Sequence, residues 1–306
     1  MTDHRAELAD QYRSGRYRGR FAPTPSGPLH LGSLLTALAS WLQARSKNGV
    51  WLLRIDDLDR PRCIKGMDSE ILHQLESHGL DWDETPRYQT QHVEAYEHAL
   101  ARLLDMGRVY PCTCTRATLD RSALDGPDGP VYSGHCRLLG LPCAERHALR
   151  YRVDDSILEF QDGWAGPQQR RMQREVGDFT LRRSDGMIGY QLACAIDEKD
   201  QCITEVVRGA DLLGSSFRQI ALMQALGLTP PQYRHGPVLK DPQGNKLSKQ
   251  NHAEPILAAA AADNLLRCLH HLKQQPPAGI AGASPRVILE WALQHWQPEA
   301  LLHLGT

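Results

Sequence analysis

The feature that most constrains the fold is a strand, a rigid turn, a helix and a second strand in direct succession near the start of the chain. Residues 17–22 have the pattern of a short strand, and the PTPSG turn at residues 23–27 cannot be helical. From His30 to Lys47 apolar residues recur with a helical period, and residues 50–55 are almost continuously apolar, as in a strand covered on both faces. This order predicts a βαβ unit, so we expect an α/β fold with a Rossmann-like, doubly wound parallel sheet.

The remaining patterns extend this fold and interrupt it once. The interruption is residues 110–142, a stretch rich in Gly, Pro and Cys that supplies little apolar core, and residues 150–185 favour short strands. The tail from Pro255 is expected to form two helices joined by a turn near Pro276. The other expected elements are helices over residues 67–78, 92–106 and 212–226, strands over residues 188–196 and 203–207, and a loop over residues 240–249.

Composition and charge limit the class of protein and its partners. Of the 306 residues, 41% are hydrophobic and 23% are charged, which is ordinary for a globular protein. The chain opens with a polar segment and holds no apolar run near 18 residues, so we expect no export and no membrane span, with the eight cysteines reduced in the cytoplasm. The 35 basic and 36 acidic residues nearly cancel, so a nucleic acid would have to be held by local arginine clusters, at residues 13–20, 170–174 and 182–183.

The segment PSGPLHLG at residues 25–32 leads into the first expected helix. Exposed N–H groups at a helix N-terminus favour phosphate. His30 is placed to donate a hydrogen bond to a phosphoryl group that gains charge, and Gly32 leaves room for a flat base. The plainer alternative is a helix cap with a surface histidine.

A second motif, KLSKQ at residues 246–250, lies far downstream in a Gly- and Asn-flanked loop. Lys246 and Lys249 are spaced to neutralise charge on a polyphosphate. By itself a lysine-rich loop is usually solvated. The two motifs together are more specific, and they predict a nucleotide site.

Four cysteines gather in the interrupting stretch. Cys112, Cys114 and Cys136 supply three soft ligands that suit tetrahedral Zn²⁺. Ligand chemistry alone offers His135 or Cys143 as the fourth. Because the cluster lies away from both nucleotide motifs, we expect one structural zinc per chain. The alternative is a group of thiols without metal.

The two nucleotide motifs resemble the HIGH and KMSKS signatures of the class I aminoacyl-tRNA synthetases. The segments RFAPTPSGPLHLG, RIDDLD, TEVVRGADL and KLSKQN are similar to the glutamyl branch of that class, over most of residues 17–255. A full glutamyl-tRNA synthetase continues beyond the last motif into a large anticodon-binding region, for which we expect no counterpart here. With CTCTR at residues 112–116 and YSGHCR at residues 132–137, it resembles the truncated paralogues of the branch, the glutamyl-Q tRNA(Asp) synthetases.

The resemblance implies an activity in two steps. L-Glutamate would react with ATP and Mg²⁺ to give glutamyl-adenylate and pyrophosphate, without tRNA and without a covalent enzyme intermediate. Glutamate would then pass to the queuosine at the wobble position of tRNA(Asp), whose anticodon stem-loop is the implied partner. We expect a monomer with no membrane partner.

The resemblance also assigns residues to the substrates. Asp56 stands where this family often has Glu, so a water or a shifted substrate would have to complete its contact with the amino group of glutamate. The alternatives are core packing for Tyr190 and a structural salt bridge for Arg208. In full, the implied sites are Arg20, Phe21, Ala22, Pro23, Thr24, Asp56, Tyr190 and Arg208 for glutamate, His30, Gly32, Lys246 and Lys249 for ATP, with His30 and Lys249 as catalytic residues, and Cys112, Cys114, Tyr132 and Cys136 for Zn²⁺.

We expect four segments along the chain, and three other functions stay open. The rival functions are a glutamyl-tRNA synthetase that charges the tRNA 3′ end, a nucleotidyltransferase that activates a small acid without RNA, and a catalytically inactive RNA-binding paralogue. The segments are residues 1–108 and 186–250 as the two halves of the catalytic domain, 109–185 as an inserted zinc-binding and acceptor-type subdomain, and 251–306 as a helical region without an anticodon-binding domain.

Overall fold

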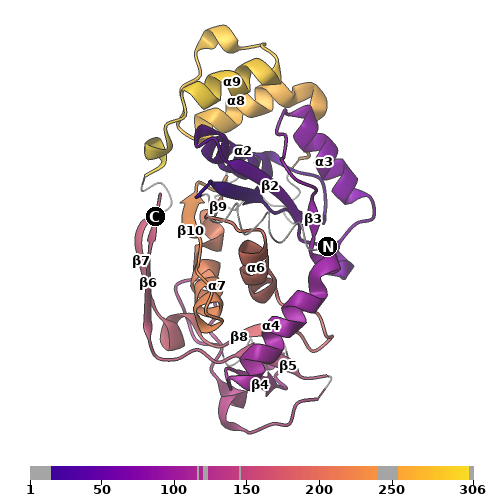
Figure 1. Cartoon of the computed structure of the whole chain (residues 1–306), viewed down its shortest axis with the longest axis vertical. Helices are drawn as coiled ribbons and strands as arrows, with labels where there is room; N and C mark the ends of the chain where they lie inside the picture. Colours follow the sequence, from indigo (N-terminus) through magenta and orange to yellow (C-terminus); the bar gives the residue numbers. More distant parts are fainter. Residues whose placement is uncertain (1–14, 116, 120–122, 145, 240–253, 303–306) are drawn as a thin grey trace.

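Two mainly parallel sheets meet edge to edge in the middle of the molecule (Figure 1). The first has the strand order β1-β2-β3, with every pairing parallel, and helix α2 connects β1 to β2. The predicted βαβ unit is therefore confirmed. Its elements are β1 at Arg18–Phe21, α2 at Leu31–Ser46, β2 at Val50–Ile55 and β3 at Arg87–Tyr88. The computed structural model describes residues 15–115, 117–119, 123–144, 146–239 and 254–302.

The second sheet has the order β7-β6-β10-β9. Strands β6, β10 and β9 run parallel, whereas β6 and β7 form an antiparallel hairpin. The N–H of Thr204 donates to the carbonyl of Arg18 at 3.0 Å, which brings β9 beside β1. The strand order thus runs outward in both directions from the β1/β9 junction, as in a doubly wound sheet. The bounds are β6 at Ile157–Asp162, β7 at Gly166–Arg171, β9 at Glu205–Gly209 and β10 at Gln232–Gly236.

Helices cover both faces of the sheets. Along β2, Trp51 and Leu53 belong to the core that faces α2, and Val50 and Leu52 belong to the core that faces α4, α6 and α7. This explains the continuous apolar run of β2, and the α/β doubly wound class is confirmed. Besides α2, the helices that flank these sheets are α3 at Met67–Ser77, α4 at Val93–Asp105, α6 at Tyr190–Asp200 and α7 at Leu213–Ala225.

The segment expected to be a strand at residues 188–196 is helix α6, so that prediction was wrong. A short apolar run does not distinguish a buried strand from a buried helix. Here the run continues into Asp197 and Glu198, which are buried on the same helix. The helix packs against α7 and α4 and therefore hides most of its surface.

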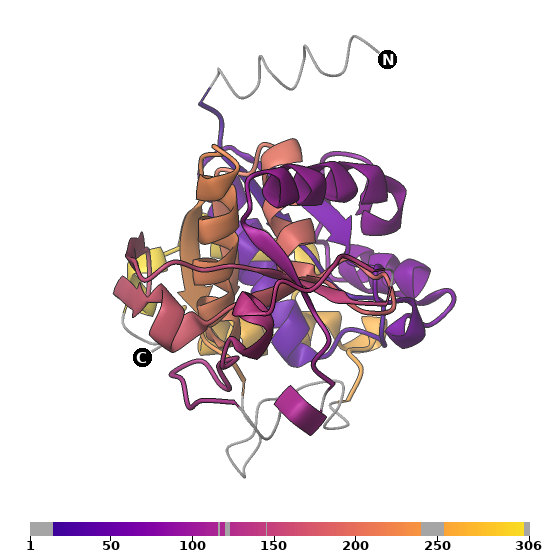
Figure 2. The ribbon, with the colours of Figure 1, turned by 90° about the horizontal axis from the view of Figure 1, so that it is seen from below.

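The segment expected as an insertion, residues 109–185, forms a small antiparallel sheet of order β4-β5-β8 at one end of the molecule, in front of α6 and α7 in Figure 2. Its separate apolar cluster is small and centres on Tyr110, Cys112 and Cys136. The same segment also contributes β6 to the large sheet. The strands are β4 at Val109–Cys112, β5 at Ala148–Tyr151 and β8 at Phe179–Arg182.

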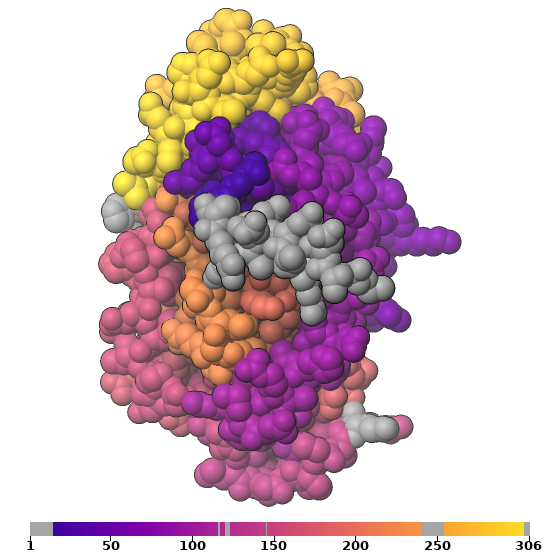
Figure 3. Space-filling view, viewed as in Figure 1, coloured from indigo at the N-terminus to yellow at the C-terminus, as the bar shows by residue number. Residues whose placement is uncertain are grey.

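Two helices at the opposite end pack over α2, namely α8 at Ala261–His271 and α9 at Pro285–Gln294. Figure 3 shows them as a yellow lobe on the indigo N-terminal residues. They match the two helices expected after Pro255. Among the described residues, no helix is long and apolar enough to cross a membrane.

Candidate active site

A cavity of about 440 Å³ opens where β1 and β9 end, at the point where the strand order reverses. Ligands of open α/β sheets bind at this switch point. The N-termini of α2 and α6 complete the wall. Of the residues predicted for glutamate and ATP, the cavity is lined by Arg20, Phe21, Ala22, Pro23, Thr24, His30, Gly32, Tyr190 and Arg208.

His30 is both the cap of α2 and part of the cavity wall. Its Nδ1 accepts hydrogen bonds from the backbone N–H groups of Gly32 and Ser33, at 3.1 and 3.3 Å. Because Nδ1 accepts, the neutral ring carries its proton on Nε2. The cap of the plainer alternative is therefore present, but His30 is buried in the cavity wall and does not lie on the surface.

Lys246 and Lys249 lie in residues 240–253, outside the described residues. The residues on either side of this segment lie at the cavity. Val238 and Leu239 line it. After the segment, Pro255 bridges to His30, and the N–H of Ile256 donates to the carbonyl of Leu29 at 2.9 Å.

Arg20 contacts a carboxylate that the sequence analysis did not identify. Its Nε and Nη2 bond Glu198 at 2.9 Å, and Nη1 lies 3.4 Å from the carbonyl of Val207. Burial raises the pKa of Glu198, but Arg20 and Arg54 outweigh burial and hold that pKa below its usual range. Glu198 is therefore an ionised partner fixed inside the wall.

Asp56 does not line the cavity. Its Oδ1 accepts from Nε of the buried Arg54 at 2.7 Å. Burial raises the pKa of Asp56 to about 6, although Arg54 opposes the shift. In this structure Asp56 belongs to the ion-pair network behind the wall.

Arg208 is buried and is held by neutral groups. Its Nε donates to Nε2 of His235 at 3.1 Å, Nη1 to the Gln219 side-chain oxygen at 2.9 Å, and Nη2 to Oγ of Ser216 at 2.7 Å. Within the described part of the chain no carboxylate pairs with Arg208, so the salt-bridge alternative finds no support there. Three of its five N–H groups are used, all by uncharged groups; its charge also helps to lower the pKa of Glu198, and Asp211 lines the same cavity.

Tyr190 is the first residue of α6, lines the cavity and is 40% exposed. Core packing is therefore wrong for this side chain. Helical spacing puts Tyr190, Cys194 and Glu198 on one face of α6. This i, i+4, i+8 pattern was the signal for Glu198, and it became visible only once the segment was known to be a helix.

The cysteine cluster comes together in the insertion. The sulfurs of Cys112, Cys114 and Cys136 all lie within 4.8 Å of one another. The Tyr132 oxygen lies 3.5 Å from the sulfurs of Cys112 and Cys114 and accepts the N–H of Cys136 at 2.9 Å. Cys143 is exposed and outside this group.

The four groups fit a tetrahedral metal. Bonds of about 2.3 Å to zinc imply ligand separations of roughly 3.8 Å, near the observed distances. Burial raises the pKa of Cys136, but hydrogen bonds from Thr113 and Tyr132 outweigh it and lower the pKa to about 6. The guanidinium of Arg150 lies 4.1 Å from the centre of the Tyr132 ring, whereas burial and the neighbouring thiols raise the pKa of the Tyr132 hydroxyl.

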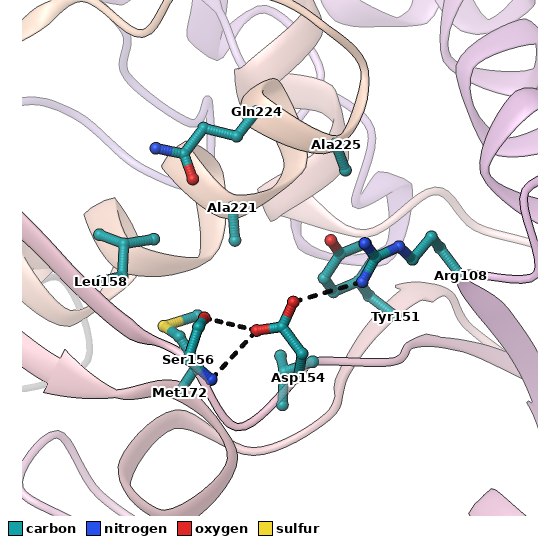
Figure 4. A pocket seen from close by; sticks show the side chains of 10 residues that line it. Arg108, Tyr151, Asp154, Ser156, Leu158, Met172, Ala221, Gln224 and Ala225 are labelled. Atoms are coloured by element: carbon teal, nitrogen blue, oxygen red, sulfur yellow. Dashed lines mark hydrogen bonds and ion pairs between the residues drawn. The ribbon is translucent and has the colours of Figure 1, made fainter.

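A second cavity, of about 220 Å³, lies between the insertion and α7 (Figure 4). No predicted site residue lines it. Asp154 at its mouth pairs with Arg108 at 3.4 Å and accepts two hydrogen bonds from Ser156. Its charged groups thus satisfy one another.

The arginine clusters differ in exposure. In the cluster at residues 13–20, Arg18 and Arg20 are 1% and 4% exposed, so the prediction that this cluster holds RNA is wrong for these two; Arg16 is exposed, and Arg13 lies outside the described residues. Because β1 is buried on both faces, the polar atoms of Arg18 and Arg20 bond groups inside the protein and cannot reach an RNA at the surface. In the other clusters, the side chains of Arg171 and Arg183 are 51% and 48% exposed.

Comparison with known proteins places the chain in a family. Residues 16–263 match the family model for the catalytic domain of class I tRNA synthetases (E and Q). The glutamyl-Q tRNA(Asp) synthetase of Methylococcus capsulatus is 48% identical over 94% of both chains, and that of Pseudomonas entomophila is 46% identical over 95% of this chain and 96% of the other.

Solved structures agree on the fold. A glutamate tRNA ligase from Elizabethkingia meningosepticum, in complex with its amino acid, superposes with a TM-score of 0.67 at 28% identity, covering 77% of this chain. This chain spans about half (52%) of that ligase. The methionyl-tRNA synthetase of Mycobacterium tuberculosis shares the fold, with a TM-score of 0.56 at 12% identity. The chain belongs to the class I aminoacyl-tRNA synthetase family, in the branch of the glutamate and glutamine enzymes.

Proposed function

We propose that this protein activates L-glutamate with ATP and transfers it to the queuosine of tRNA(Asp). The observation that carries the proposal is the buried Arg208, which lines the cavity at the switch point of the sheet and donates its hydrogen bonds to uncharged groups. Such a cation suits a carboxylate. The names of the relatives from Methylococcus and Pseudomonas support the choice of glutamate and of the RNA.

In the first step a carboxylate oxygen of glutamate attacks the α-phosphorus of ATP, and pyrophosphate leaves. His30 supplies a ring N–H at the N-terminus of α2, where backbone N–H groups also favour phosphate. Gly32 admits the nucleotide base. Lys246 and Lys249 neutralise the departing pyrophosphate, and Mg²⁺ bound to ATP adds charge neutralisation.

The glutamate site combines the backbone at residues 20–24 with side chains from both walls. Arg208 binds a substrate carboxylate, and Tyr190 adds a hydroxyl donor. Arg20 contributes through the N–H groups that Glu198 leaves unused. Asp56 acts through Arg54 unless the substrate draws its carboxylate toward the cavity.

Glutamate-dependent exchange of labelled pyrophosphate into ATP, in the absence of tRNA, tests the activation step. We expect exchange with L-glutamate and at most a trace with L-glutamine or L-aspartate. Exchange that starts only after tRNA is added would contradict the proposal and favour an enzyme that charges the tRNA 3′ end. No exchange under either condition would favour an inactive RNA-binding protein.

The acceptor is tested with an isolated anticodon stem-loop. We expect the tRNA(Asp) stem-loop with queuosine to accept labelled glutamate, and the same RNA with guanosine not to accept it. Exposed arginines such as Arg171 and Arg183 would hold phosphates, so binding should weaken as salt is added. Equal charging of tRNA(Glu), independent of queuosine, would overturn this assignment.

We also propose a structural zinc held by Cys112, Cys114, Cys136 and Tyr132. These four residues would hold Zn²⁺ between the end of β4 and the short helix at His135–Leu138, where the metal would supply a crosslink. Because the apolar cluster there is small, metal binding supplies folding free energy to the insertion. Three reduced thiols suit the cytoplasm, and we propose that the protein acts there as a monomer.

Metal analysis of matched variants tests the zinc site. We expect one zinc per native chain, loss of zinc in Cys114→Ser, and retention in Cys143→Ser, whose thiol lies outside the cluster. Tyr132→Phe should bind zinc more weakly. Native protein without zinc refutes the site, and zinc lost from Cys143→Ser but kept by Tyr132→Phe would correct the fourth ligand.

A further inference from the structure

A buried aspartate and a buried histidine lie behind Arg208, on the two strands that follow it across the sheet. His235 on β10 pairs in register with Arg208 on β9, and Asp162 at the end of β6 pairs with the neighbouring Tyr233. Asp162 and His235 are 1% and 0% exposed. The three side chains therefore form a row from the inserted hairpin to the cavity.

Asp162 is fixed by four hydrogen bonds. Its Oδ1 accepts the backbone N–H groups of Trp164, Ala165 and His235, at 2.9, 2.8 and 3.1 Å. Its Oδ2 accepts from Nδ1 of His235 at 2.6 Å. The carboxylate can neither turn nor leave, so it holds the ring proton of His235 on Nδ1.

With the proton on Nδ1, Nε2 of His235 is an acceptor. It accepts from Nε of Arg208 and from the hydroxyl of Ser216, both at 3.1 Å. Ser216 in turn accepts from Nη2 of Arg208, and the ring of Tyr233 lies under the guanidinium at 5.3 Å. One edge of Arg208 is thus anchored.

The surroundings keep His235 neutral. Burial lowers its pKa, and Arg208 on β9 lowers it further, against the opposite effect of Asp162 on β6 and of Asp211 before α7. Ser216 and Gln219 of α7 and Tyr233 of β10 face the row as uncharged groups. A protonated ring would turn an N–H toward the N–H of Arg208.

We propose that Asp162 and His235 are positioning residues that set the orientation of Arg208 toward the substrate carboxylate. The proposal rests on the proposed function, because it takes Arg208 as the residue that binds glutamate. Neither side chain lines the cavity, so both act through Arg208. The inserted hairpin thereby takes part in substrate recognition through Asp162.

Two histidine variants form the matched test. In His235→Gln the longer amide keeps an acceptor near the position of Nε2, whereas in His235→Asn the shorter amide reaches only Asp162. Both lose the same ring stacking on Tyr233. In pyrophosphate exchange we expect His235→Asn to raise the KM for glutamate about 10- to 100-fold and His235→Gln to raise it much less.

Asp162→Asn tests the tautomer. Its amide oxygen keeps the three backbone N–H groups, so the NH₂ group faces Nδ1 of His235 and shifts the ring proton to Nε2. We expect the KM for glutamate to rise about 10-fold or more while the KM for ATP stays constant. Asp178→Asn, at a buried aspartate in the insertion bonded to Tyr110 and Arg137, is the control that should leave both values unchanged.

The pH dependence gives a readout that a structural role would not move. The KM for glutamate of the native enzyme should rise at acid pH as His235 is protonated, and His235→Gln should lack that rise. Folded Asp162→Asn and His235→Asn with the native KM would overturn the positioning role. Native protein without glutamate-dependent exchange would instead overturn the proposed function, so the two failures are distinct.

Discussion

The arginines of the two walls of the active-site cavity differ in their partners, which are carboxylates on one wall and uncharged groups on the other. On the wall of β1 and α6, Arg20 faces Glu198, and the buried Arg54 lies 2.7 Å from Asp56 and 3.4 Å from Glu198. On the wall of β9 and α7, Arg208 donates only to uncharged groups among the described residues. A cation that already has its counter-ion contributes to the scaffold, whereas one without a counter-ion retains affinity for an anion. The difference indicates where the carboxylate of a substrate gains most.

Replacing Arg208, the arginine without a bonded carboxylate in the described ranges, should impair activity and gives the largest expected effect. In Arg208→Gln, kcat/KM for glutamate in pyrophosphate exchange should fall about 10³- to 10⁴-fold, since a buried charged fork is lost. Stability to urea should change by no more than about 1 kcal/mol, because removing an uncompensated buried cation relieves its desolvation. A folded variant with native exchange would place the carboxylate elsewhere.

Replacing Arg20, the arginine paired with a buried carboxylate, should instead lower the stability of the protein. Arg20→Met leaves Glu198 buried beside only Arg54, and we expect a loss of about 3–4 kcal/mol in the free energy of unfolding. Urea denaturation followed by circular dichroism measures it. The double variant Arg20→Met, Glu198→Leu removes both charges and should recover part of the loss. No recovery would mean that packing, not the ion pair, sets the cost.

Replacing Lys249 should distinguish the binding of the glutamate carboxylate from the departure of pyrophosphate. Lys249→Ala should lower the rate of adenylate formation about 10- to 100-fold and leave the Kd for glutamate unchanged, because its charge is needed as pyrophosphate departs. Rapid-quench measurement of adenylate and calorimetric titration of glutamate separate the two quantities. Lys199→Ala, at an exposed lysine on α6, is the matched control. A parallel loss of glutamate affinity would contradict the role.

The first half of the fold could be predicted because periodicity and turn chemistry agree there. The strand at residues 17–22, the helix from His30 and the strand at residues 50–55 match β1, α2 and β2 within a residue or two. The prediction for residues 188–196 was wrong because a buried strand and a buried helix both give a short apolar run. Only tertiary packing against α4 and α7 decides between strand and helix.

Site residues that lie in sequence motifs could be predicted, whereas the partners that the tertiary fold brings to them could not. His30, Arg208 and the cysteine cluster stand in recognisable segments. The partners of the arginines do not: Glu198 lies 178 residues from Arg20, and Asp162 lies 73 residues from His235. The first pair exists because helix α6 packs beside β1, and the second because β6 and β10 are neighbouring parallel strands, so no local pattern in the sequence records either pair.

Replacing Asp56 gives the smallest expected effect. It is diagnostic because burial and the ion pair with Arg54 shift the pKa of Asp56 in opposite directions. Its pKa is raised to about 6, chiefly by burial, whereas an unfolded chain has a value of about 3.9. Between pH 4 and 6 the folded protein therefore binds the proton more strongly, so its free energy of unfolding should fall as the pH rises through this window, by about 2 kcal/mol at most.

The variant Asp56→Asn cannot titrate, so the stability of the native protein relative to it should decline from pH 4 to 6 and level off above pH 7. Urea denaturation of both proteins at each pH measures the difference. If the difference instead grows with pH, Arg54 outweighs burial, the folded pKa lies below the unfolded one, and the β1 and α6 wall is a net stabilising ion-pair network at neutral pH. In that case Asp56 would already be fully charged when substrate arrives, and its carboxylate would be available to the amino group of glutamate at the cost of its bond to Arg54.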